Sequence, residues 1–239
     1  MSKEELKIVN ERLISHLLEN GIKNACYYEP HVPAMYWNGV HKKIAFCNLE
    51  PYSAYENTDT IIGIKPLDEE RFFCHWFFNK TVGTTVLINY LLNYSLQKNL
   101  WLTENTAKEI SWQLKHDTEG YDKLCDDFSK SMYFNFRFSQ SNSVSADNYY
   151  IFNKYVSDEF YRMHFRNFVK AAEIDVLIVS SSAGAGLIPI IYPELKNRFK
   201  YCGEAIFYDG VFFVSMPHPS RISWKSRVDL VNKIVKILK

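Results

Sequence analysis

The sequence lacks the features that mark secreted, zinc-binding and membrane-spanning proteins. It has five cysteines, an odd number, and no two of them stand in C-x-x-C spacing. A disulfide framework and a structural zinc site are therefore both disfavoured, and a reducing compartment is the simplest interpretation. No apolar run reaches the roughly 20 residues that a membrane-spanning helix needs, and residues 1–21 are charged and amphipathic, unlike a signal peptide. We expect a soluble intracellular protein, cytoplasmic if its source is bacterial, with no membrane partner.

The sequence also lacks an excess of charge of one sign, since 28 Lys and Arg face 27 Asp and Glu for a net charge of +1. A nucleic acid would therefore have to bind a local basic patch. One such patch lies in residues 218–239, where six basic residues and one acidic residue give a net charge of +5. The alternative is that this is only the solvated face of an amphipathic helix.

What the chain does have is enough apolar material, 47% of 239 residues, for one sizeable core. We expect a single domain over residues 1–239. Helical periodicity or composition predicts helices over 4–20, 83–100, 104–128, 155–172 and from about 224 to the end, and strands over 41–48, 131–139, 175–179 and 210–216. Thr84 or Thr85 is the expected N-cap of the helix over 83–100. Strands that alternate with helices predict an α/β fold, with three α/β/α layers around a central, mostly parallel sheet.

Polar, turn-forming residues follow four of these strands, at 48–52, 135–140, 180–184 and 218–223. Ligands bind beyond the carboxyl ends of the strands in such sheets, so we expect these segments to meet at one edge.

Two residues in these segments are suited to chemistry. Glu50 can act as a general base or stabilise a developing cation, although an ordinary solvated loop glutamate is the alternative. His218 lies between two prolines that stiffen its backbone, and the alternative there is a turn histidine without a role.

Taken together, the order and spacing of these segments resemble the uracil-DNA glycosylase superfamily over roughly residues 35–239. The segment IAFCNLEPYS at 44–53 is similar to the family's first motif, a strand followed by Gly-Gln-Asp-Pro-Tyr-His. HPSRIS at 218–223 is similar to the family's His-Pro-Ser-Pro-Leu-Ser, which follows its last strand. Asn135, in SMYFNFRFS, corresponds to a base-reading asparagine, and IGIKP at 62–66 to a segment that carries a base-stacking residue.

The resemblance implies an enzyme that extrudes a nucleotide from DNA and hydrolyses its N-glycosidic bond. Glu50 would stabilise the sugar cation and position or deprotonate the water, while His218 would donate to the departing base. Asn135 would read the base edge, Tyr52 would wall the pocket, and Ile62 stands at the stacking position. Residues implied to contact DNA are Thr84, Thr85, Ser181, Ser220, Arg221, Ser223 and Lys225, with Ile222 as the apolar wedge that fills the vacated stack.

The same resemblance implies no metal and no cofactor, and we expect a monomer whose partner is DNA with a damaged or deaminated base. Glutamate stands at position 50 where the family's motif has aspartate. Two alternatives stay open: a family relative without turnover that binds DNA or a protein, and an unrelated α/β enzyme that acts on a nucleotide-like ligand.

Overall fold

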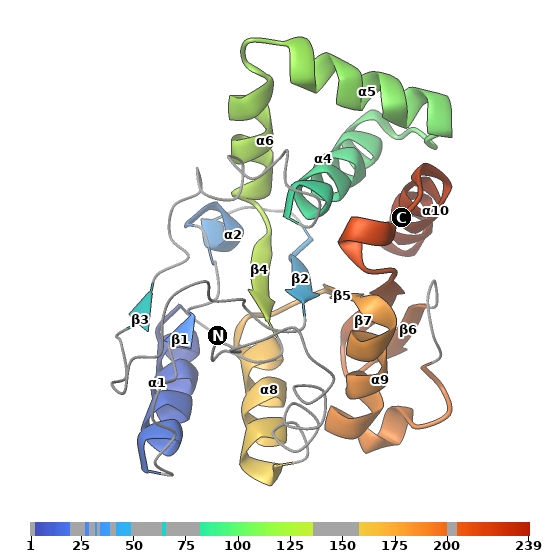
Figure 1. The fold of residues 1–239 in the computed structure, drawn as a ribbon. Coiled ribbons are helices and arrows are strands. Elements are labelled where there is room, and N and C mark those ends of the chain that lie inside the picture. The colour runs from blue at the N-terminus through green and yellow to red at the C-terminus, as the bar shows by residue number, and fades with distance from the viewer. Residues whose placement is uncertain are drawn as a thin grey trace.

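The structure, a computed structural model, contains helices on both sides of one central sheet (Figure 1). It describes residues 3–19, 27–28, 32, 34–38, 42–48, 64–65, 82–135, 158–199 and 205–239. The α-helices are α1 (Lys3–Glu19), α2 (Ala34–Asn38), α4 (Val82–Lys98), α5 (Glu104–His116), α6 (Gly120–Phe128), α8 (Glu159–Ala171), α9 (Ser181–Ile191) and α10 (Trp224–Leu238). The strands are β1 (Tyr27–Tyr28), β2 (Ile44–Asn48), β3 (Ile64–Lys65), β4 (Met132–Asn135), β5 (Val176–Ser180), β6 (Ala205–Tyr208) and β7 (Val211–Met216), and two 3₁₀ turns are η2 (Pro193–Leu195) and η3 (Pro219–Arg221).

The central sheet has five strands in the order β4-β2-β5-β7-β6. The first four are parallel, and β6 pairs with β7 in the antiparallel direction. Every residue of β2 and of β5 is buried, which explains why both strands are continuous apolar runs rather than alternating ones. The prediction of an α/β fold with a mostly parallel sheet is confirmed.

Alternate residues of each strand pack on opposite faces of this sheet, as the period of two requires. Leu177 and Val179 belong to an apolar cluster with α1, α8 and α9. Val176 and Ile178 belong to a second cluster, with α4, α5, α6 and α10. Within the part of the chain that the structure describes, no helix is long and apolar enough to cross a membrane.

Most predicted elements lie within a few residues of the observed ones, and four details are wrong. The helix expected over 104–128 is two helices, because residues 117–119 form a turn between α5 and α6. The turn-forming segment expected at 180–184 instead ends β5 at Ser180 and begins α9 at Ser181. The antiparallel strand β6 was not predicted. Neither Thr84 nor Thr85 caps α4, because the helix already begins at Val82. The predicted residues 136–139 and 155–157 lie outside the described part of the chain.

Candidate functional site

The four parallel strands β4, β2, β5 and β7 have their carboxyl ends at one edge of the sheet. Of the segments expected to meet there, residues 49–52 and 136–140 lie outside the described part of the chain. Asn48 at the end of β2 pairs with Asn135 at the end of β4. Val179 of β5 lies between Cys47 of β2 and Ser215 of β7. Because β5 alone separates β2 from β7, the ends of these two strands are about 10 Å apart, two strand spacings.

A chain of buried hydrogen bonds crosses the sheet at this edge. The hydroxyl of Ser180 donates to the side-chain oxygen of Asn48, and the Asn48 amide nitrogen donates to the Tyr133 hydroxyl. All three residues are buried, and Asn48 is only 8% exposed. Burial raises the pKa of Tyr133 well above its ordinary value, against the opposing effect of the Asn48 hydrogen bond. Ser180, Asn48 and Tyr133 therefore form a neutral, hydrogen-bonded layer of buried polar side chains at this edge, which we call the polar floor.

Sequence reasoning did not identify this floor. Asn48 and Ser180 were noted only as polar residues at strand ends, and Tyr133 was not noted. The available signal was the strand period, since residues 44, 46 and 48 of β2 share one face. Which residues of β4 and β5 lie beside Asn48 depends on the strand order, which the period does not give.

His218 follows β7 at the same edge and is half buried. Its backbone carbonyl accepts a hydrogen bond of 2.8 Å from the Arg221 amide, which closes the η3 turn. This turn packs against α4. Burial, and to a smaller extent the nearby charge of Arg221, lowers the pKa of His218 below its ordinary value. The imidazole is therefore neutral at pH 7 and carries one N–H donor.

The residues after His218 fall into two groups. Arg221 and Lys225 are exposed, beside the start of α10. Ser223 is exposed too, but its hydroxyl accepts a hydrogen bond of 3.1 Å from the Ser226 amide and so caps α10. Ile222 is only 6% exposed and packs in the apolar cluster with α4 and α10. Because this side chain fills the core, it is not available as the apolar wedge that the family resemblance implies.

The two threonines of α4 are also placed differently from the prediction. Thr85 is completely buried and Thr84 is 8% exposed. A side chain without accessible surface cannot contact a phosphate, so Thr85 is excluded from this role in the present conformation, and Thr84 has little surface to offer.

Three predicted site residues, Glu50, Tyr52 and Ile62, lie outside the described residues. For Asn135 the structure gives the backbone, which ends β4 beside Asn48. Likewise, Ser181 begins α9 directly after β5, and Ser220 lies in η3. The backbone of Asn135 thus ends a strand at this edge, and the backbones of Ser181 and Ser220 lie shortly after two other strands that end there.

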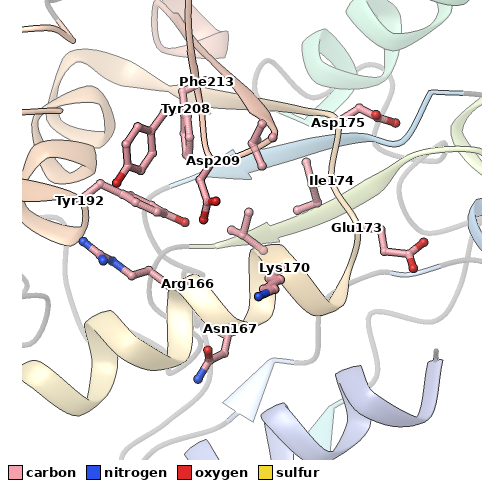
Figure 2. A pocket seen from close by; sticks show the side chains of 13 residues that line it. Arg166, Asn167, Lys170, Glu173, Ile174, Asp175, Tyr192, Tyr208, Asp209 and Phe213 are labelled. Atoms are coloured by element: carbon pink, nitrogen blue, oxygen red, sulfur yellow. The ribbon is translucent and has the colours of Figure 1, made fainter. Parts of the chain in front are cut away.

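A hollow of about 460 Å³ lies at the opposite edge, beside the amino ends of β5 and β7 (Figure 2). Tyr192, Tyr208 and Phe213 form its aromatic side. Arg166 lies 4.8 Å from the centre of the Tyr192 ring, and its guanidinium donates to the Ile191 carbonyl at 2.7 Å and to the Glu194 carboxylate. The Arg166 guanidinium is therefore already occupied by contacts within the protein. The hollow lies at the other edge of the sheet from the predicted site.

Among the residues that the structure describes, no group of three or more His, Cys, Asp and Glu side chains is placed to hold a metal ion. Comparison with protein-family models, with curated proteins and with solved structures found no match. The functional argument therefore depends on the chemistry and placement of the residues at the carboxyl edge.

Proposed function

We propose that this protein is a DNA glycosylase of the uracil-DNA glycosylase type, which extrudes a deaminated base and hydrolyses its N-glycosidic bond. One observation carries the proposal: a single strand, β5, separates the strand that leads to Glu50 from the strand that leads to His218. The loops that carry the two groups thus start about 10 Å apart at one edge. A nucleotide placed between them can meet one group with its sugar and the other with its base.

Two partial charges develop as the bond to the base breaks, one on each side. The sugar becomes positive, and the carboxylate of Glu50 stabilises it and orients the attacking water. The departing base becomes negative, and the neutral imidazole of His218 donates a hydrogen bond to it. The lowered pKa of His218 favours the neutral ring, which keeps one N–H group for this hydrogen bond.

Phosphate contacts come from exposed cations beside His218. Arg221 and Lys225 lie within seven residues of it, and neither makes an ion pair with another described residue. Such contacts add affinity for any DNA sequence and make binding depend on salt concentration. The proposal assigns no wedge to Ile222, because that side chain is in the core.

The test is release of a base from oligonucleotides that contain uracil, hypoxanthine or xanthine, followed by alkaline cleavage at the abasic sites. Under single-turnover conditions His218→Ala should slow cleavage by about 10²–10³, the usual effect of losing one such donor. Glu50→Gln should also slow it, because the amide keeps the shape but not the charge. Both variants should still bind the duplex, since the lost interactions strengthen in the transition state.

His116→Ala is the matched control, because His116 is an exposed histidine at the end of α5. Cleavage at the wild-type rate by His218→Ala or Glu50→Gln would show that the catalytic pair is wrongly assigned. Firm, salt-dependent duplex binding without release of any base would instead make the protein a DNA-binding module without turnover.

A further inference from the structure

Among the strands that the structure describes, β6 is the last one on its side of the central sheet. Its hairpin to β7 turns through Asp209 and Gly210, whose φ angles of 48° and 82° are both positive, as a two-residue type I′ turn requires. In such a hairpin the pair that flanks the turn, Tyr208 and Val211, is the hydrogen-bonded one, and the pairs alternate from there. Phe207 and Ala205 therefore stand at non-hydrogen-bonded positions, and their backbone N–H and C=O groups point away from β7.

The backbone of β7 agrees with this alternation. Phe212 is the partner of Phe207, and its amide donates 2.8 Å to the Asp175 carbonyl on the β5 side, away from β6. In the described part of the chain, β7 is the only strand that pairs with β6. Two residues of β6 thus offer both donors and acceptors to a further strand.

A groove of about 630 Å³ runs beside this edge. Its apolar lining comes from Ala205 and Ile206 of β6 and from Ile237 of α10. Next to it, the Phe207 ring is 55% exposed and lies 4.7 Å from the Phe212 ring, centre to centre. This apolar surface favours an extended polypeptide with some apolar side chains.

The charged lining of the groove is entirely basic. Lys233 and Lys236 come from α10, and Arg198 comes from the turn after η2. Leu195 of η2 packs in the apolar cluster on the sheet face opposite to that of α10. The three cations therefore approach the edge from both faces, and none forms an ion pair with another described residue.

We propose that the β6 edge binds an extended, acidic segment of a partner protein, which joins the sheet as an additional strand. Side chains of an added strand alternate between the two faces, so acidic residues on one face meet Lys233 and Lys236, and those on the other meet Arg198. Main-chain hydrogen bonds to Ala205 and Phe207 give affinity, and the cations select for charge. DNA fits this edge less well, because phosphates only accept hydrogen bonds and leave the carbonyls of β6 unused.

The probe is a short labelled peptide of valine and threonine with glutamates on both faces of the extended chain, and its binding is measured by fluorescence anisotropy. The counterpart with glutamine should bind about tenfold more weakly if three exposed ion pairs are lost. The double variant Lys233→Glu/Lys236→Glu should weaken binding of the acidic peptide and reduce its salt dependence. Lys7→Glu, which reverses the charge of an exposed lysine of α1 outside the groove, should leave peptide binding unchanged.

Two further changes test strand addition itself. Phe207→Pro removes an outward N–H without removing a bond to β7 and should weaken binding about fivefold, the effect of one backbone hydrogen bond. Phe207→Ala keeps the N–H and isolates the contribution of the ring. On the wild-type protein, methylation of alternate peptide nitrogens along one edge should abolish binding and requires no protein variant.

Equal affinity for the glutamate and glutamine peptides would overturn the proposal. The lysines would then serve to prevent this edge from pairing with strands of other chains, which is a common role of lysine beside edge strands. Binding that survives N-methylation would show attraction by charge alone. Duplex DNA that displaces the peptide, together with DNA binding that Phe207→Pro does not alter, would assign the groove to phosphates instead.

Discussion

Asp127 is a buried carboxylic acid whose pKa lies near neutral pH. Its carboxyl group is buried between α4 and α6, where Asn89 and Asn93 each donate 2.9 Å to the same oxygen, Oδ2. Ser131 in turn donates 2.6 Å to the Asn89 side-chain oxygen. Burial raises the pKa of Asp127 to about 7, although both asparagine hydrogen bonds act in the opposite direction.

The sign of the stability effect follows from proton binding. Between the ordinary pKa of 3.8 and the folded value of about 7, the folded protein holds a proton that the unfolded chain has lost. The contribution of protonated Asp127 to the free energy of unfolding is therefore fully present below the ordinary pKa of 3.8, and it is lost as the pH rises through about 7. The difference between a pKa of 3.8 in the unfolded chain and about 7 in the folded protein corresponds to as much as about 4 kcal/mol.

Asp127→Asn should remove this dependence. The asparagine oxygen can accept the same two hydrogen bonds, and the side chain never acquires a charge. If the two proteins are equally stable where Asp127 is fully protonated, we expect the variant to be more stable by about 1 kcal/mol at pH 4.5 and by several kcal/mol, at most about 4, at pH 8.

The assay is urea denaturation of both proteins at a series of pH values, with the difference in unfolding free energy plotted against pH. Subtracting the variant from the wild type is necessary because other groups that titrate in the same pH range change the stability of both proteins equally. Burial lowers the pKa of His164 to about 4, for example, which makes stability rise with pH in both proteins. A difference that stays constant from pH 4.5 to 8, or that favours the wild type at high pH, would refute the argument for Asp127.

Two more predictions concern a glycine and an arginine. Gly120→Ala should destabilise the protein by about 1–3 kcal/mol, because a Cβ there would lie 1.9 Å from the Leu114 carbonyl oxygen. The control is Gly186→Ala inside α9, where an added Cβ meets open space. Thermal or urea unfolding should show that this control stabilises the protein by up to about 1 kcal/mol. Arg221→Ala should raise the pKa of His218 part of the way to its ordinary value, because burial still lowers it after the charge has gone; an unchanged imidazole NMR titration would show that this charge has no influence.

Much of the sheet could be predicted because local pattern and burial agree. The strand β5 was recognisable from Val176–Val179, an apolar run too short for a helix and fully buried. The hairpin of β6 and β7 also left a signal, Asp209-Gly210 between two apolar runs, which is typical of a type I′ turn. The strand β6 could therefore have been predicted from this turn and the apolar run before it.

Other features could not be predicted because distant contacts decide them. Small residues at 181–184 are typical of a loop, but α9 buries Leu187, Ile188 and Ile191 against the sheet, and this packing favours a helix. The position of Ile222 in its motif implies an apolar wedge, whereas the side chain packs in the cluster with α4 and α10. No local pattern reports such coverage.

The polar floor at the carboxyl edge has a consequence for how any pH profile of this protein should be interpreted. Asn48 and Ser180 do not titrate, and burial raises the pKa of Tyr133 far above neutrality. The hydrogen bonds from Ser180 to Asn48 and on to Tyr133 therefore keep one protonation state across the physiological range. Titration seen in ligand binding or turnover between pH 5 and 8 then has to come from groups outside the floor, such as Asp127, whose pKa burial raises to about 7, or from the ligand itself.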